Sequence, residues 1–477
     1  MTIPQPRVHQ TGTGPAEPPA LSLRDALAGV EAGPAVVGLA ADRVAAHFAA
    51  HHAGVPATPI TRDEPPVTYR VPGSAMPVRV GVYGAERRVL GWLPGMPDPV
   101  NPTAARRLAE SAIPPLTVAD PVCQQVVSTP GDLTRLPALT ATPRDAGPYL
   151  TTGIVFAGDP ASGEIAMSVH RMLVLDANRL AIWMVPGRAL RQMHDAAVGA
   201  GGRLAVSVNI GAPPAAMVAS ALGTAFLPAG VDKLGMAGAL ACAPVRLGAG
   251  VSQPAPVLAD SEIVIEGYLD DTVADETIVG PPGVSLPEFL GYDGEARTGL
   301  PVLTVTAVTT RRDPWFHGVI GPGREQSVIL GLAGALSVAL SETGNLVHDL
   351  HFSAAGGGML LLIAAVRKTA ADDDRAPAGI AERILRGHMF VKLVVFTDPD
   401  VDIRAPEDVL WAITTRANLG TDTATFTGFR PLPVDPSHSA AWGSARGQDG
   451  GSQRSYVDAT TPFSLRDKVF RSFGDRS

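Results

Sequence analysis

Residues Thr151–Leu175, TTGIVFAGDPASGEIAMSVHRMLVL, contain two short apolar runs separated by a polar turn. Apolar runs of this length, bounded by turn residues, are typical of β-strands. The same pattern of short strands with few helices continues on both sides, which predicts a β-barrel. The predicted strands lie at Gly153–Phe156, Ile165–Val169, Leu180–Met184, Leu204–Ile210, Pro244–Leu247, Glu262–Tyr268 and Val302–Thr309.

The segments that flank this β-rich region have a different pattern. Before it, strands are predicted at VTYRV, VRVGVY and RVLGWL between Val67 and Leu93, next to helical segments. After it, helices and strands alternate from Gln326 to Thr415, which indicates a separate α/β domain. The Gly- and Ser-rich stretch Ser437–Ser455 is predicted to be a loop.

We therefore expect an α/β (α+β) chain with a disordered tail and three folded parts. The predicted parts are a tail at 1–20, an N-terminal α/β region at 21–120, a split β-barrel at 121–322 and a C-terminal α/β domain at 323–477.

Composition excludes several classes of protein. Hydrophobic residues make up 45% of the 477 residues and charged residues 18%, which is a globular composition. The net charge of −8 gives no overall basic footprint for nucleic acid. No apolar stretch reaches the roughly 20 residues that a membrane-spanning helix needs. The first residues lack an apolar signal core, so we expect a soluble, cytoplasmic protein.

Several segments form an ordered set along the chain. In the stretch quoted above, the strand AMSVHR ends in an arginine, Arg171. The later segments are PPAAMVAS (Pro213–Ser220), EIVIEGY (Glu262–Tyr268), TTRRDP (Thr309–Pro314), HGVIGPG (His317–Gly323), Lys392–Asp402, VLWAITTR (Val409–Arg416) and DATTP (Asp458–Pro462). Taken in this order, the segments resemble the UbiD-like family of decarboxylases.

The resemblance implies a fold, a cofactor and a reaction. The fold would be an N-terminal α/β region, a split barrel that binds prenylated FMN and a C-terminal oligomerisation domain, in a homodimer. The reaction would be reversible decarboxylation of an aromatic, heteroaromatic or α,β-unsaturated acid, and a flavin prenyltransferase would supply the cofactor. The cofactor carries the difficult chemistry, while the protein supplies orientation and electrostatics.

The resemblance also assigns roles to individual residues. Arg171 matches the catalytic arginine, and a guanidinium can hold a carboxylate with two parallel hydrogen bonds. The other matched positions are assigned to the cofactor: Met167, Ser168, Val169 and His170 beside the flavin, Ser220 on a facing helix, and Lys392 near the phosphate. A lysine on a buried strand needs an anionic partner, either this phosphate or Asp398 or Asp402.

The chain departs from the family at the proton donor. Family members carry two glutamates around a Gly-Pro-x-Gly turn, whereas this chain has Val279 and Val284. Valine cannot move a proton. Glu288 and Glu276 are the candidate replacements, and His317 is a third, because an imidazole titrates near neutral pH.

The metal site departs as well. The family holds a divalent metal against the flavin phosphate with Asn, His and Glu. The positions that match the asparagine and the glutamate hold Ala166 and Lys233. The position that matches the histidine falls within Pro186–Ala189, where Arg188 is the nearest residue. Divalent cations of this kind need oxygen ligands. We therefore expect the metal to be absent or displaced, with Arg188 and Lys233 pairing directly with the phosphate.

These departures leave three functions open. The first is an active decarboxylase with a rearranged proton donor. The second is a flavin-binding homologue that does not decarboxylate, or a partner subunit. The third is a family member that uses ordinary FMN for redox chemistry. The retained Arg171 and the nearby carboxylates favour the first.

Overall fold

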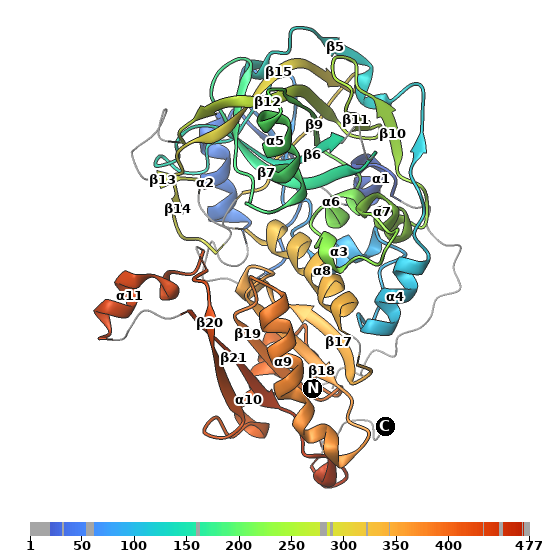
Figure 1. Cartoon of the computed structure of the whole chain (residues 1–477). Coiled ribbons are helices and arrows are strands. Elements are labelled where there is room, and N and C mark those ends of the chain that lie inside the picture. Colours follow the sequence, from blue (N-terminus) through green and yellow to red (C-terminus); the bar gives the residue numbers. More distant parts are fainter. Residues whose placement is uncertain are drawn as a thin grey trace.

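A computed structural model gives the arrangement of most of the chain (Figure 1). The residues it describes are 20–30, 33–53, 62–158, 163–276, 284–286, 290–320, 323–342, 344–432, 434–447, 452–469 and 471. Within these ranges no helix is both long and apolar enough to cross a membrane.

A closed β-barrel occupies the upper half of the molecule in Figure 1, which confirms the predicted barrel. Its strands follow the order β12-β9-β6-β7-β8-β15, and antiparallel pairing of β12 with β15 closes the ring. Because successive side chains of a strand point to opposite faces, alternate residues such as Val206, Val208 and Ile210 of β9 enter one apolar core. The barrel strands are β6 (Tyr149–Gly158), β7 (Ile165–Val174), β8 (Arg179–Ile182), β9 (Leu204–Ile210), β12 (Ile263–Ala274) and β15 (Leu300–Thr310).

Buried helices lie between the barrel and the C-terminal domain. α6 (Pro214–Ser220) and α7 (Lys233–Ala241) are made mainly of small apolar residues, so the two helices can pack closely. They share one apolar core with α3 (Glu86–Gly91), α4 (Pro102–Glu110) and α8 (Arg324–Ser341). α5 (Ala189–Gly199) packs against the barrel strands.

Small sheets surround the barrel. One has the order β1-β2-β3-β16 and another the order β11-β10-β4, while β5 extends the barrel sheet beside β15. β13 and β14 form a separate two-stranded sheet. The helices and strands around the barrel are α1 (Leu23–Leu27), α2 (Ala41–His51), β1 (Val36–Val37), β2 (Val67–Arg70), β3 (Val78–Val80), β4 (Leu116–Thr117), β5 (Val126–Ser128), β10 (Arg246–Ala249), β11 (Pro256–Leu258), β13 (Val284–Ser285), β14 (Gly294–Glu295) and β16 (Phe316–His317).

The strand predicted at RVLGWL is wrong, because this segment belongs to helix α3 and the turn that follows it. Glu86 lies in the first turn of α3, where a carboxylate favours the positive end of the helix dipole. Val89 and Leu93, four residues apart, are both buried in the same core. Val89 lies in α3 and Leu93 in the turn after it, so the helix and its turn enter the core together.

The C-terminal domain is a sheet of order β17-β18-β19-β21-β20 with helices on both faces. In β18, Leu362, Ala364 and Val366 face the core of α8 and α9, whereas Ile363 and Ala365 face α10. This alternation confirms the predicted α/β domain. Its elements are β17 (Val347–Phe352), β18 (Leu361–Val366), β19 (Leu393–Thr397), β20 (Thr423–Phe429), β21 (Ser452–Ala459), α9 (Ala376–Gly387) and α10 (Pro406–Arg416).

The loop predicted at Ser437–Ser455 is wrong in two places. The segment contains helix α11 (Ala440–Ala445) and the start of β21, which lies inside the sheet between β19 and β20. The Ser and Gly residues of the segment favoured a loop, although its last part, SQRSYVDA, forms a strand. Strand pairing on both sides satisfies the backbone of β21 and overrides that local composition.

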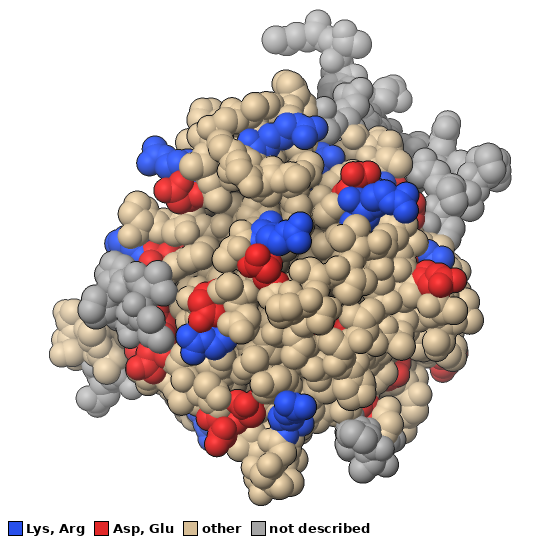
Figure 2. All heavy atoms as spheres, turned by 90° about the horizontal axis from the view of Figure 1, so that it is seen from above, with Lys and Arg blue, Asp and Glu red and all other residues tan. Residues whose placement is uncertain are grey.

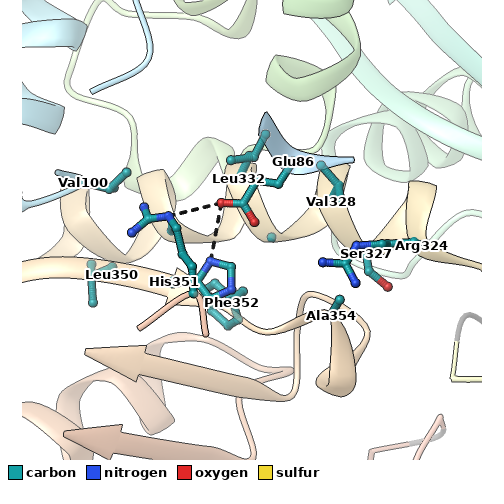
Figure 3. A pocket seen from close by; sticks show the side chains of 13 residues that line it. Glu86, Val100, Arg324, Ser327, Val328, Leu332, Leu350, His351, Phe352 and Ala354 are labelled. Carbon is teal, nitrogen blue, oxygen red and sulfur yellow. Dashed lines mark ion pairs between the residues drawn. The ribbon is translucent and has the colours of Figure 1, made fainter. Parts of the chain in front are cut away.

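A small cavity with charged walls lies between α3, α8 and β17, at the junction of the two halves (Figure 3). The Glu86 carboxylate lies 3.6 Å from Nδ1 of His351 and 3.3 Å from Nε of Arg404. Arg404 also donates to Asp349 at 2.6 Å. Burial raises the pKa of Glu86, but the neighbouring His351 and Arg404 outweigh it, so the pKa lies below its usual value. The pairs therefore join helix α3 to the C-terminal sheet.

Candidate functional site

Strand β7 sets the direction of the candidate residues. Because side chains alternate along a strand, Met167, Val169 and Arg171 share one face, and Ser168 and His170 share the other. Met167 and Val169 pack in or against the core that contains α6 and α7. Arg171 therefore emerges from the barrel on the face that the buried helices cover.

The structure brings Arg171 to Glu276. One Nη2 atom lies 3.9 Å from Oε1 of Glu276 and 3.2 Å from Oγ of Ser285. The arginine side chain is 17% exposed and the glutamate side chain 2% exposed. A guanidinium with part of its surface open and a buried carboxylate beside it can receive a second, exogenous carboxylate.

Glu276 is held by two further donors. The backbone N–H of Arg297 donates to Oε2 at 2.9 Å, and the Tyr149 hydroxyl lies 3.4 Å from Oε1. Burial, together with the negative charge of Glu276, raises the pKa of Tyr149 well above its ordinary value. Tyr149 is therefore a neutral donor, and Glu276 is the one ionisable acid that the described residues place beside Arg171.

His170 is held in one tautomer. Its Nδ1 lies 2.9 Å from the Trp183 carbonyl oxygen, so Nδ1 carries the proton. Nε2 then accepts from the Ser168 hydroxyl at 2.7 Å. Burial, and to a lesser degree the charge of Lys233, lowers the pKa of His170 to about 4. The ring is neutral at physiological pH, and the Arg297 guanidinium covers the Trp183 ring at 4.1 Å.

Lys233 joins three elements. Its Nζ donates to the carbonyl oxygen of Met167 at 2.9 Å and to that of Ser220 at 2.7 Å. Burial lowers the pKa of Lys233 to about 7, and the positive charge of Arg188 contributes to this shift. Met167, Ser168, His170, Ser220 and Lys233 thus form one cluster, with Arg188 close enough to perturb it.

The remaining predicted residues have other partners or lie outside the described chain. Arg188 precedes α5 and its Nη2 lies 3.8 Å from the Met389 sulfur. Lys392 pairs with Asp435 at 2.5 Å rather than with Asp398 or Asp402. His317 is buried with Nε2 3.3 Å from Glu325. Glu288, Val279 and the Gly-Pro-Pro-Gly turn lie outside the described residues.

Sequence reasoning missed four residues at the site. Tyr149, Trp183, Ser285 and Arg297 contact the predicted residues but belong to no motif. Strand pairing of Tyr149 with Leu173 of β7 brings the tyrosine beside Arg171. No signal in the sequence announces that pairing.

The described residues do not fit a protein-bound metal. Among them, no three His, Cys, Asp or Glu side chains are grouped so that they could hold an ion. Ala166 is buried and apolar, and Lys233 and Arg188 are cations. On the face of the molecule seen from above, the acidic and basic side chains of the described residues are interspersed, and they form no basic patch on that face (Figure 2).

Two domain models of one family match the chain. The Rift-related domain of 3-octaprenyl-4-hydroxybenzoate carboxy-lyase (UbiD) matches residues 116–325, and the C-terminal domain of the same enzyme matches residues 327–459. The chain belongs to the UbiD family. Its members are carboxy-lyases, so this UbiD-family chain is an enzyme of that class.

Relatives and solved structures agree with the UbiD assignment. Gallate decarboxylase of Lactiplantibacillus plantarum is 32% identical over 78% of this chain and 76% of the relative. The apo 3,4-dihydroxybenzoic acid decarboxylase of Klebsiella pneumoniae superposes with a TM-score of 0.86, at 29% identity, over 96% of this chain and 98% of that one.

A third relative has been solved with a flavin. The UbiD-class enzyme HmfF of Pelotomaculum thermopropionicum, in complex with FMN, superposes with a TM-score of 0.78, at 29% identity, over 94% of this chain and 96% of that one. An evolved dimeric form of HmfF in complex with prFMN gives a TM-score of 0.73, at 28% identity, over 94% of this chain and 98% of that one.

Proposed function

We propose that this UbiD-family enzyme catalyses the reversible, non-oxidative decarboxylation of an aromatic, heteroaromatic or α,β-unsaturated acid with prenylated FMN. The observation that carries the proposal is the contact of Arg171 with the buried Glu276, on the strand whose backbone also contacts Lys233. The names of the relatives, which include decarboxylases of gallate and 3,4-dihydroxybenzoate, support an aromatic acid as substrate.

The residues around β7 fit a flavin phosphate. The Lys233 ammonium faces two carbonyl oxygens, and it has no carboxylate partner in the described part of the chain. With Arg188 it would hold the phosphate. Backbone at Met167–Arg171 and at Ser220 would border the ring system. When bound, the prenylated flavin supplies the electron acceptance that carbon–carbon bond cleavage requires.

The protein's own residues would bind the acid and move one proton. Arg171 orients the substrate carboxylate through parallel N–H donors, which places its carbon–carbon bond for cleavage. The carboxylate leaves as carbon dioxide. Glu276, having taken up a proton, delivers that proton from its carboxyl oxygen to the carbon that lost the carboxylate. The reaction balances, because one carboxylate anion and one proton give carbon dioxide and a product in which hydrogen replaces the carboxylate.

Glu288, which the sequence favours as the proton donor, is the alternative to Glu276, because it is close in sequence to Ser285, which contacts Arg171. His317 is the third candidate. In the structure its imidazole faces Glu325, and its backbone carbonyl accepts from Thr152.

A second function has one observation in its favour. Val279 and Val284 stand where the family's two glutamates are expected, which favours a flavin-binding homologue that does not turn over acids, or a partner subunit.

A homodimer is also proposed. The exposed Leu410, Trp411 and Leu419 of the C-terminal domain offer apolar surface that a second copy would cover.

The test is turnover by the holoenzyme. The full chain, co-expressed with a flavin prenyltransferase, is offered a panel of hydroxybenzoic, furoic and cinnamic acids, and carbon dioxide release is measured. We expect at least one acid to turn over. Arg171→Ala should lose at least a hundredfold in kcat/KM, and Arg171→Lys a smaller part, because an ammonium lacks the planar pair of donors.

Arg179→Ala is the matched control. Arg179 lies on the next strand of the barrel, β8, and pairs with Asp176 at the surface. Its removal should leave turnover unchanged. No turnover of any acid by prenyl-flavin-loaded protein would favour the non-decarboxylating homologue instead.

A further inference from the structure

The Lys233 ammonium has the surroundings of a bound metal cation. Lys233 is the first residue of α7, and the Asp232 side chain that caps this helix accepts from the Gly235 N–H rather than from the lysine. The two oxygens that Nζ contacts are backbone carbonyls, one from β7 and one from the end of α6. Carbonyl oxygens are also the ligands that hard cations use in proteins.

The charge at this position is not balanced by the described chain. An ammonium has three N–H groups, and two of them are used by Met167 and Ser220. Arg188 adds a second positive charge nearby, and His170, on the strand side, is a neutral ring that adds none. A buried charge without a counter-charge is costly. The third N–H of Lys233 is therefore available to an anion.

We propose that Lys233 is a built-in cation that replaces a divalent metal at the flavin phosphate, so that this enzyme binds its flavin without metal. The inference rests on the proposed flavin function. It adds that the cation is covalently part of α7 and is held by the carbonyls of Met167 and Ser220. The loss of the family's metal ligands at these positions, an asparagine where this chain has Ala166 and a glutamate where it has Lys233, fits this arrangement, because a second cation there would be repelled.

A pH dependence follows from the same geometry. In the ligand-free protein the pKa of Lys233 is lowered to about 7. A phosphate dianion favours the protonated lysine, so binding raises that pKa. The phosphate becomes a dianion above its second pKa of about 6, so FMN affinity should be highest between about pH 6 and pH 7 and should fall as the pH rises above that range. His170 stays neutral over this range, so its titration does not produce this profile.

The experiment measures FMN binding by the flavin-free full chain, with EDTA or with Mn²⁺, and also riboflavin binding, since riboflavin lacks the phosphate. Metal content is measured on the same samples. The wild type should bind FMN with a Kd that EDTA and Mn²⁺ change by less than twofold, and without stoichiometric metal. Lys233→Met should weaken FMN at least tenfold while leaving riboflavin binding unchanged, which also shows that the variant is folded.

Lys233→Glu is the sharper variant. It places a carboxylate among the same carbonyl oxygens, so FMN binding should be lost in EDTA and regained with Mn²⁺. Lys468→Glu, an equal change of charge at an exposed position, should match the wild type. Wild-type FMN binding that needs Mn²⁺ would overturn the inference and leave the flavin function intact. Failure of the wild type to bind FMN under any condition would instead refute the flavin function.

Discussion

Replacement of Glu276 by glutamine should abolish proton delivery while leaving the shape of the site in place. A glutamine oxygen can still accept from the Arg297 N–H, but the carboxamide cannot supply a proton to carbon. Loss of a general acid costs about 10²- to 10⁴-fold in kcat, or about 3–5 kcal/mol. The charge attraction to Arg171 is lost too. At 3.9 Å and an effective dielectric constant of about 20, its gross value is about 4 kcal/mol.

Most of that attraction is offset, because the neutral side chain no longer has to be desolvated as an ion. The net cost to the free energy of unfolding should be about 1–3 kcal/mol. The assay is carbon dioxide release by holoenzyme together with a urea unfolding curve. Glu342→Gln is the control, since Glu342 is equally buried and pairs with Arg383 at 2.8 Å in another part of the molecule. It should lower stability and keep kcat.

The reasoning fails if Glu276→Gln keeps more than about a hundredth of the wild-type kcat, because a hundredfold loss is the smallest that removal of a general acid usually gives. Glu288→Gln is prepared in parallel. Activity lost in that variant and kept in Glu276→Gln would move the proton donor to Glu288.

Three further predictions concern the scaffold. Glu86→Gln should lower the free energy of unfolding by about 1–3 kcal/mol, because it leaves Arg404 and His351 without their shared carboxylate. Loss of the exposed Arg386–Glu382 pair should change that free energy by less than about 1 kcal/mol. The midpoints of denaturant unfolding curves measure both effects. The pKa of His170 is about 4 in the folded chain and about 6.5 in the unfolded chain. Its burial should therefore leave the free energy of unfolding unchanged above pH 6.5 and lower it by up to about 3 kcal/mol as the pH falls toward 4. A His170→Asn variant that is as sensitive to acid as the wild type would contradict this. Gly153→Ala should cost about 1–3 kcal/mol, because a Cβ there would lie 2.4 Å from Met172 and 2.6 Å from Val208, and a variant as stable as the wild type would show that the barrel wall yields.

The barrel and the C-terminal α/β domain could be predicted because their signals are local. Turn residues bound short apolar strands such as Leu204–Ile210, where predicted and observed limits coincide. The helix α3 and the strand β21 were predicted wrongly, because tertiary partners override local composition there. RVLGWL joins a core shared with α4 and α8, and SQRSYVDA lies between two strands.

The site was predictable only where a residue carries a motif. Arg171 and Lys233 could be singled out from the sequence, and the structure places both beside β7. The contacts of Arg171 with Glu276 and Ser285, and of Tyr149 with Glu276, join segments more than a hundred residues apart, so no spacing along the chain reveals them. The choice between Glu276 and Glu288 is of the same kind. It depends on which carboxylate the fold brings to the guanidinium.

The most direct test of the central claim is the identity of the bound cofactor. The full chain is co-expressed with a flavin prenyltransferase, and the cofactor released from the purified protein is measured by mass spectrometry and absorbance. We predict prenylated FMN at close to one per chain. Ordinary FMN alone would point to a different flavin reaction, and a protein without flavin would contradict the account of Arg188, Lys233 and β7.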